Sequence, residues 1–254
     1  MTAESVGRLL PFRRGDAAWN MALDQALLES VDRTARQDGR AAATLRFYGW
    51  KTATLSLGYF QSSEPLPPTF RNVAQVRRST GGGAILHHHE LTYSLTYPIQ
   101  ARDSGARMEL YRGVHAAIAQ VLAERSISAR PHRLDSRLGG DADAFLCFQR
   151  RTDEDLIVSG YKVLGSAQRR MRQAVLQHGS LLLRVSRHAP ELPGLFELTS
   201  IDLDVEKLSE QIARQLGQTL GIRFAADGET EQERTSALQI VADRFASDRW
   251  WNRH

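Results

Sequence analysis

The sequence of 254 residues has a single cysteine, Cys147, and no long run of apolar residues. One cysteine cannot form an internal disulfide, so a reducing compartment is expected. The first residues, 1–13, lack the apolar core of a signal peptide, and no segment is apolar for long enough to cross a bilayer. These absences together predict a cytoplasmic protein that does not enter a membrane.

Internal repeats and low-complexity tracts are also missing, and neither sign of charge dominates the chain. The formal net charge is +4, and the acidic and basic residues are interspersed. A mild positive excess suits an acidic partner, and it equally suits a solvated surface rich in arginine. No helix-turn-helix or aromatic–basic RNA motif accompanies these charges, so nucleic-acid binding is not expected.

Apolar residues recur with helical spacing near both ends of the chain and with strand spacing in its middle. Helices are predicted over 19–27 (capped by Asp16), 110–122, 205–220 and 237–245. Strands are predicted over 44–48, 54–57, 91–97, 156–159, 163–165 and 174–185, the last with a break at His178-Gly179. Segment 131–151 has no clean period, and we expect a long loop that carries Cys147. This order favours an α+β fold, with 201–254 as a C-terminal helical extension.

A glycine-rich segment runs from Arg77 to Gly83 and reads RRSTGGG. Three successive glycines leave the backbone bare, so its N–H groups can approach a ligand oxygen closely. The two arginines add forked donors, and the segment could hold a phosphate, a carboxylate or an oxyanion. Its spacing is neither that of a Walker loop nor that of a dinucleotide-binding loop, and a flexible turn between strands is an equally open interpretation.

Three adjacent histidines, His87, His88 and His89, look at first like a metal site. Neighbouring residues of a strand point to opposite faces, so the three side chains cannot easily bind one ion. No other His/Cys pair has convincing ligand spacing, and we predict no metal. One histidine that faces inward and orients a loop is the favoured interpretation.

Cys147 and Lys162 each allow two interpretations. Cys147 stands among Phe145, Leu146 and Phe148, which suits a small buried side chain, and it becomes reactive only if a nearby cation favours the thiolate. Lys162 lies in an otherwise apolar strand among small residues, so it either reaches solvent or points its charge into a site.

Taken in order, these motifs resemble the lipoate–protein ligase and octanoyltransferase family, which is kin to the biotin ligases. The matching segments are Asn20 to Asp24, Leu45 to Trp50, Ser56 to Gln61, Arg77 to Gly83 with His87, Glu90 to Ser94, Gly160 to Gln168 and Leu176 to Ser180. Several long motifs in the same order carry more weight than any one of them. The glycine–arginine signature of biotin ligases is not found, which disfavours biotin as the substrate.

The resemblance implies one biotin/lipoate ligase-like catalytic domain over 1–254, built on a mixed β-sheet flanked by helices. It also implies an acyl tunnel between the sheet and the glycine-rich loop. Residues that match the family's pocket motifs are expected to bind the substrate: Arg78, Gly81, Gly82, Gly83, His87, Gly165, Ser166, Ala167, His178 and Gly179.

Within the family, Cys147 lies fifteen residues before Lys162, as in the branch of octanoyltransferases that has a cysteine before the lysine strand. This implies that Cys147 and Lys162 are catalytic and that octanoate passes through a Cys147 thioester without a cofactor. The implied donor is octanoyl-acyl carrier protein. The implied acceptor is a lysine of a lipoyl domain or of the glycine-cleavage H protein.

Two alternatives stay open. In an ATP-dependent lipoate–protein ligase, ATP and Mg²⁺ would form an acyl-adenylate held by the glycines and Lys162, and Cys147 would only pack. His88, where many relatives have Asp, and Gly83, which completes a triple glycine as in ligases, keep this alternative open. The second alternative is a non-catalytic protein that binds an acyl chain or a carrier protein.

Overall fold

The computed structural model describes residues 5–39, 41–100, 105–134 and 140–254, and a mixed sheet of eight strands forms the centre of this part. The strand order is β11-β1-β2-β6-β10-β9-β8-β7. The strands are β1 (Ser5–Gly15), β2 (Thr44–Trp50), β6 (Glu90–Pro98), β7 (Arg130–Pro131), β8 (Leu156–Val158), β9 (Tyr161–Arg170), β10 (Ala174–Leu182) and β11 (Ile222–Ala226). β1 pairs in parallel with β2 and β11, and the other neighbours are antiparallel.

A smaller sheet of three described strands lies beside the main one and leads into the glycine-rich segment. Its strands are β3 (Thr54–Leu57), β4 (Ala74–Arg77) and β5 (Ile85–His87). Since the glycines connect β4 to β5, this sheet holds both ends of the glycine-rich loop.

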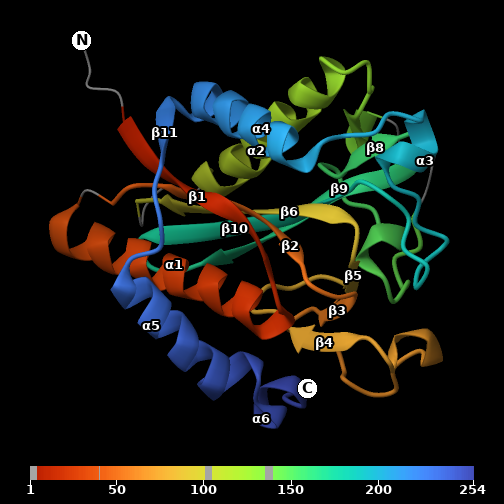
Figure 1. Cartoon of the computed structure of the whole chain (residues 1–254), viewed down its shortest axis with the longest axis horizontal. Coiled ribbons are helices and arrows are strands. Elements are labelled where there is room, and N and C mark those ends of the chain that lie inside the picture. The colour runs from red at the N-terminus through yellow and green to blue at the C-terminus, as the bar shows by residue number, and fades with distance from the viewer. Residues whose placement is uncertain (1–4, 40, 101–104, 135–139) are drawn as a thin grey trace.

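Helices cover both faces of the main sheet (Figure 1). On one face lie α1 (Ala17–Asp38), α5 (Glu231–Ile240) and α6 (Asp248–Trp251), and on the other lie α2 (Ala106–Ala123) and α4 (Val205–Leu220), with the short α3 (Leu195–Thr199) near one end. Apolar clusters fill both layers, one around Phe47 and Leu95 under α2 and α4, the other around Leu27 and Trp50 under α1. The predicted α+β class is therefore confirmed.

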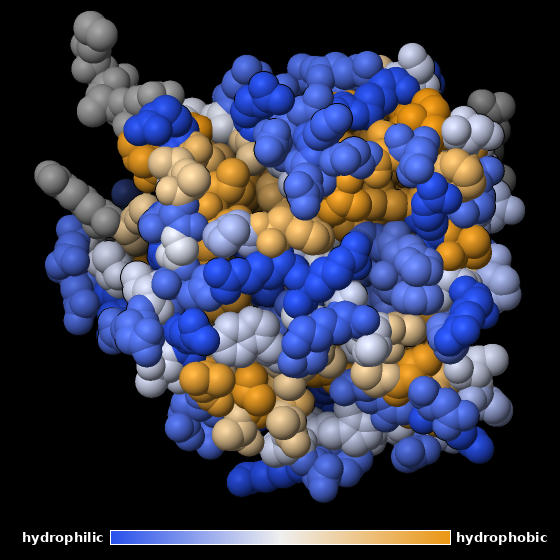
Figure 2. Space-filling view, in the orientation of Figure 1, coloured by the Kyte–Doolittle hydropathy of each residue, from blue (hydrophilic) through white to orange (hydrophobic). Residues whose placement is uncertain are grey.

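The outer surface is mostly polar in the view of Figure 2. Hydrophobic residues are exposed between α4 and β1 and around α5, where Leu238 is one of the exposed apolar side chains. No described helix combines the length and the apolar character that a membrane span requires.

The N-terminal end of α1 follows the sequence prediction. Asp16 caps the helix, and its carboxylate accepts a hydrogen bond from the backbone N–H of Trp19 at 3.0 Å. The helix continues well past the predicted range to Asp38, and Gly39 ends it in the left-handed conformation (φ 63°).

The predicted break of the β10 strand at His178-Gly179 is wrong. β10 pairs with β6 without interruption from Ala174 to Leu182. A Cβ atom at position 179 would collide with the Ser166 hydroxyl and approach the Tyr93 ring to 2.6 Å. Glycine is therefore required by close packing of neighbouring strands rather than by a bulge.

The ranges of strands β8 and β9, which form a hairpin, also differ from the predicted ranges. The turn of this hairpin consists of Ser159 and Gly160, which both have positive φ (48° and 84°), as in a two-residue type I′ turn. The second strand, predicted over 163–165, is longer in the structure, where β9 begins at Tyr161 and runs to Arg170.

Strands β1 and β11 were not predicted. Together they form one edge of the main sheet, with β11 outermost. β1 alternates poorly between exposed and buried residues, so it lacks the two-residue period by which strands are recognised. β11 is only five residues long and follows α4 directly, and it pairs with β1 from Ser5 to Leu9. Segment 201–254 therefore contributes a strand to the main sheet as well as helices.

Candidate active site

Most of the residues expected to bind substrate line one narrow cavity of about 50 Å³ between the main sheet and the glycine-rich loop. The expected residues on its wall are Arg78, Gly81, Gly82, His87, Cys147, Gly165, Ser166, Ala167, His178 and Gly179. The cavity is also lined by three apolar side chains: Met21 of α1, Ile85 of β5 and Phe148, which follows the cysteine. Gly83 and Lys162 do not line the cavity itself, and both lie against Cys147.

Cys147 begins a short 3₁₀ turn, Cys147–Gln149, that is tied to the glycine-rich loop. Its backbone N–H donates to the Ala84 carbonyl at 2.7 Å, and the Ala84 N–H donates to the Phe145 carbonyl at 3.0 Å. This pairing holds the thiol at the cavity wall, in a segment that the sequence predicted as a loop.

Lys162 points from β9 toward the cysteine. Its Nζ atom lies 3.8 Å from Cys147 Sγ and donates to the Cys147 carbonyl at 3.2 Å. Only 4% of Lys162 is exposed, so the side chain does not reach solvent. Of the two interpretations of this lysine, the structure favours a charge that points into the site.

Asp155 pairs with Lys162, and the sequence did not identify it as a site residue. Its Oδ2 atom lies 2.8 Å from Lys162 Nζ and accepts from the Thr152 N–H at 2.7 Å, and both charged side chains are 2% exposed. A lysine buried to this degree requires a counter-ion, and Asp155 provides it. The residue stands in a run of three acids, 153–155, which in sequence looks like an ordinary solvated loop.

The arginines before the glycines hold the loop in place. Arg77, fully buried, donates to the carbonyls of Gly58, Tyr59, Gln61 and Trp251. The terminal nitrogens of Arg78 donate to the carbonyls of Ser56, Gly81 and Gly83 at 2.8–2.9 Å. Burial lowers the pKa of Arg78 to about 10, and the nearby Cys147 opposes this shift. These donors are thus engaged by backbone, contrary to the forked anion donors that the sequence suggested.

The three histidines point in different directions. His87 faces inward, where its Nδ1 atom lies 2.5 Å from Glu90 Oε1 and its ring stacks on Trp50 at 3.9 Å. Burial lowers the pKa of His87, and the Glu90 carboxylate opposes this effect. His88 contacts Ser186 Oγ at 2.9 Å, and His89 is exposed. The described residues contain no group of three or more His, Cys, Asp or Glu that could hold a metal ion.

His178 joins the glycine-rich loop to α1 through a buried polar chain. Its Nε2 atom lies 2.7 Å from Thr80 Oγ1, and its Nδ1 atom lies 3.4 Å from Asp24 Oδ2. Burial alone would raise the pKa of Asp24, but Arg46 at 2.7 Å and His178 hold it below its usual value. Neither Asp24 nor Arg46 was singled out as a site residue from the sequence, although both lie in the segments that carry the family resemblance.

Ser166 lies on the cavity wall through its backbone rather than its hydroxyl. Its Oγ atom turns to the other face of the sheet, where it contacts His115 Nε2 at 2.7 Å and the Tyr93 hydroxyl at 2.6 Å. The Ser166 N–H donates to the Tyr111 hydroxyl at 3.3 Å. Ser166 therefore connects the cavity wall to a polar cluster beneath α2.

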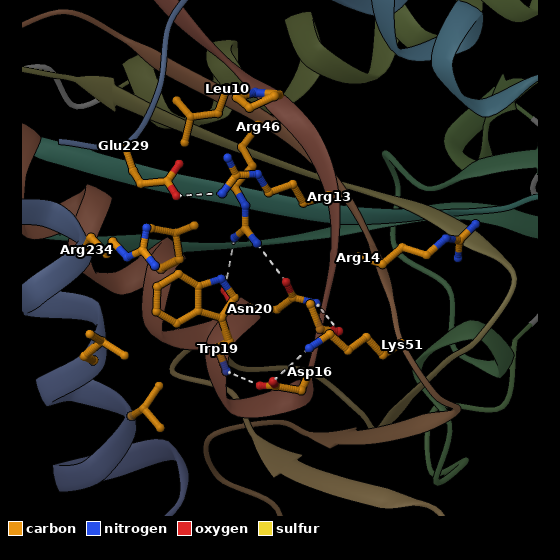
Figure 3. Close-up of a pocket in the computed structure, with 15 residues that line it drawn as sticks. Leu10, Arg13, Arg14, Asp16, Trp19, Asn20, Arg46, Lys51, Glu229 and Arg234 are labelled. Carbon is orange, nitrogen blue, oxygen red and sulfur yellow. Dashed lines mark hydrogen bonds and ion pairs between the residues drawn. The ribbon is translucent and has the colours of Figure 1, made fainter. Parts of the chain in front are cut away.

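A larger hollow of about 460 Å³ lies between β1, the start of α1 and α5, and is lined by several cations (Figure 3). Its charges are largely paired: Arg13 with Glu229 at 2.9 Å and Lys51 with Asp16 at 3.6 Å. None of the expected site residues lines it, and its lining contains no cysteine, serine or threonine. The smaller cavity beside Cys147 is therefore the candidate active site.

The chain is similar to proteins of one known family. The model of the lipoyl protein ligase A/B catalytic domain matches residues 16–214. An octanoyltransferase LipM from Kyrpidia tusciae is 32% identical, over 96% of this chain and 97% of its own. Similar proteins of the same name come from Symbiobacterium thermophilum (32% identical, 97% and 98% covered) and Halalkalibacterium halodurans (30% identical, 92% and 94% covered).

Solved structures with the same fold agree with the family match. A putative lipoate protein ligase from T. acidophilum superposes with a TM-score of 0.78 at 24% identity, covering 97% of this chain and 98% of its own. A lipoate-protein ligase A bound with ATP gives a TM-score of 0.76 at 23% identity, with 97% and 98% covered. The expected ligase-like mixed sheet flanked by helices is therefore confirmed.

Proposed function

The chain belongs to the lipoyl protein ligase A/B catalytic domain family, and we propose that it is an octanoyltransferase that carries its acyl group as a thioester of Cys147. Relatives named octanoyltransferase LipM, about 30% identical over nearly the whole chain, support the activity. The observation that carries the mechanism is the 3.8 Å separation between Lys162 Nζ and Cys147 Sγ at the cavity wall.

The side chains around the sulfur suit a nucleophilic cysteine. A positive charge close to the sulfur favours the thiolate, which is the reactive form. The Lys162 charge is retained in a buried position because Asp155 pairs with it at 2.8 Å. Without Asp155, the buried Lys162 side chain would have no counter-ion to hold it beside the sulfur.

In the first step, the Cys147 thiolate attacks the thioester carbonyl of octanoyl-acyl carrier protein. A carbon–sulfur bond to Cys147 forms, the bond to the carrier sulfur breaks, and the carrier leaves as a thiolate that takes a proton from water. The negative charge on the carbonyl oxygen needs a donor, and the Lys162 ammonium, 3.8 Å from Cys147 Sγ, is close enough to provide it. The backbone N–H of Ser166, on the cavity wall, already donates to Tyr111 and is not free for this role.

In the second step, a lysine amine of a lipoyl domain or of the glycine-cleavage H protein attacks the octanoyl-Cys147 thioester. The amide bond forms, Cys147 leaves as a thiolate, and the amine proton passes to water. Lys162 does not accept this proton, because an ammonium paired with Asp155 has no free lone pair for it. A thioester is less stable than an amide, so the transfer requires neither ATP nor Mg²⁺.

The acyl chain is expected to enter the cavity between the sheet and the glycine-rich loop. The present space of about 50 Å³ has room for about four water molecules, less than an eight-carbon chain needs. Met21 on the wall has a flexible side chain that can move aside. We expect the reaction to occur in the cytoplasm, where thiols are kept reduced.

The proposal is tested by supplying octanoyl-acyl carrier protein and an unmodified lipoyl domain without ATP. We expect octanoyl-lysine on the lipoyl domain with the wild type and none with Cys147→Ala. If Cys147→Ser kept full activity with ATP and free lipoate, the ATP-dependent ligase would be the correct assignment. If the wild type retained octanoate without any covalent product, the protein would be a non-catalytic acyl-binding protein.

A further inference from the structure

A cluster of arginines and aromatic rings lies beside the glycine-rich loop, on the side of the C-terminal residues. We call it the arginine–aromatic patch, and it consists of Tyr59, Phe60, Arg169, Arg244, Trp250 and Arg253. The Arg253 guanidinium lies 4.2 Å from the centre of the Tyr59 ring and 4.5 Å from that of Trp250. Arg244 lies 5.1 Å from the Trp250 ring, and Arg169 lies 5.8 Å from the Tyr59 ring.

The three arginines of the patch form no ion pair with an acid in the part of the chain that the structure describes. Among the described residues, no carboxylate oxygen lies within 4.0 Å of a guanidinium nitrogen of Arg169, Arg244 or Arg253. Burial lowers the pKa of Arg244, Glu29 opposes the shift, and the charges of Arg169 and Arg253 lower it further. The three arginines therefore repel one another, a repulsion that a bound acidic surface would relieve.

This lack of pairing contrasts with the larger hollow on the other side of α1, where Arg13 and Lys51 have acidic partners. Asp243, which borders the patch, accepts from Gln239 at 2.8 Å instead of from an arginine. Asp243 therefore forms no ion pair with the arginines of the patch.

The patch is connected directly to the wall of the active-site cavity. The Tyr59 N–H donates to the Thr80 carbonyl at 2.8 Å, and Arg169 donates to the Ser79 carbonyl at 2.8 Å. The Phe60 ring, 76% exposed, lies close to Gly81 of the cavity wall. A macromolecule bound to the patch would therefore sit next to the opening that leads to Cys147.

The form of the surface suits a protein rather than a small anion. Phe60 presents an exposed aromatic ring among the cations, and a shallow hollow of about 610 Å³ beside it is lined by Arg244, Trp250 and Arg253. Aromatic and arginine side chains are the residues that contribute most to protein–protein binding.

We propose that the arginine–aromatic patch binds an acidic surface of the carrier protein that delivers the octanoyl thioester to Cys147. This inference rests on the proposed octanoyl transfer and adds to it the place where the donor docks. Docking there would bring the thioester to the cavity mouth, and opposite charges would speed the encounter at low ionic strength.

The test compares two octanoyl donors in the doubly substituted Arg244→Gln/Arg253→Gln protein. One donor is octanoyl-acyl carrier protein, and the other is octanoyl-N-acetylcysteamine, a small uncharged thioester that needs no docking surface. We expect kcat/KM for acylation by the carrier protein to fall about tenfold at low salt and acylation by the small thioester to stay unchanged. Arg253→Lys, which keeps the charge, should retain most of the activity.

The matched control is Arg214→Gln, an exposed arginine of α4 on the opposite face of the sheet, which should react normally with both donors. The inference is overturned if the double variant uses the carrier protein as well as the wild type does, or if both donors slow equally. The affinity of the enzyme for the carrier protein, measured directly, separates docking from chemistry. If binding depends on the patch while neither donor acylates the wild type, the docking surface stands and the proposed function fails.

Discussion

The ammonium group of Lys162 lies 2.8 Å from the carboxylate of Asp155, and both side chains are almost completely buried beside the sulfur of Cys147. Burial of two charges is costly unless each satisfies the other, and removal of one partner leaves an uncompensated charge. This pair therefore links the stability of the cavity wall to the reactivity of the cysteine.

Replacing Asp155 by Asn should damage both properties. We expect a loss of about 3–5 kcal/mol in the free energy of unfolding, as for other broken buried pairs. Without its counter-ion the Lys162 ammonium is no longer held beside the sulfur, so alkylation of Cys147 by iodoacetamide at pH 7 should slow. Urea unfolding and the alkylation rate measure the two effects. Asp153→Asn, an exposed neighbour, is the control, and an equal effect of the two substitutions would contradict the role of the pair.

His115 should make the protein less stable as the pH falls below neutral. Burial lowers the pKa of His115 to about 4. Its Nδ1 atom contacts the Glu154 carbonyl at 2.6 Å, and its Nε2 atom contacts the Ser166 hydroxyl. In the unfolded chain the imidazole titrates near 6.5, so between pH 6.5 and 4 the unfolded state binds more protons. The stability from this group is complete above pH 6.5 and is lost progressively as the pH falls toward 4.

The size of this effect follows from the shift of about 2.5 units, which corresponds to about 3 kcal/mol. Urea unfolding of the wild type at pH 7 and at pH 5 measures the part of this effect that falls between those pH values, about 2 kcal/mol. His115→Gln cannot titrate, so its stability should change less between the two pH values. If the variant and the wild type lost equal stability on acidification, other groups would account for the pH dependence.

Met21 should limit the length of the acyl chain. Its side chain lies on the wall of a cavity that must widen to hold octanoate, so Met21→Trp should favour shorter chains and Met21→Ala longer ones. Acylation by six-, eight- and ten-carbon thioesters measures the preference. Leu23→Ala changes the same helix on the side of the larger hollow and should leave the preference unaltered. A preference that does not move with the size of residue 21 would mean that the chain lies elsewhere.

A lysine at position 78 should not be able to replace the hydrogen bonds of Arg78. Its two terminal nitrogens reach the carbonyls of Ser56, Gly81 and Gly83 at once, a geometry that one ammonium cannot reproduce. We expect Arg78→Lys to lower the unfolding free energy by about 1–3 kcal/mol, because carbonyls are left without donors, and to slow acylation of Cys147. Thermal unfolding and acylation kinetics test this, and a fully active, fully stable variant would contradict it.

The sequence predicted those features that depend on residues close together in the chain. The Asp16 cap and the strand predicted over 91–97 follow from neighbouring residues, and both are present in the structure, where residues 90–96 of β6 are all buried. The family motifs also selected residues that the fold brings to one cavity, although Cys147 and Lys162 are fifteen residues apart. In these cases the informative pattern is contained in a short stretch of chain.

The missed features depend on contacts between distant segments. Asp155 looks like one of three surface acids until β8 and β9 bury it against Lys162. The donors of Arg77 are directed at carbonyls from segments 58–61 and 251, which no local pattern reveals. Strands β1 and β11 become strands by pairing with each other across most of the sequence.

The central claim is tested most directly by the intact mass of the protein after it is mixed with octanoyl-acyl carrier protein without ATP. The account predicts an increase of one octanoyl group on Cys147, which disappears when an unmodified lipoyl domain is added and reappears on the lysine of that domain. Cys147→Ala should show no increase. A wild-type protein that stays unmodified while the lipoyl domain still becomes octanoylated would contradict the thioester intermediate.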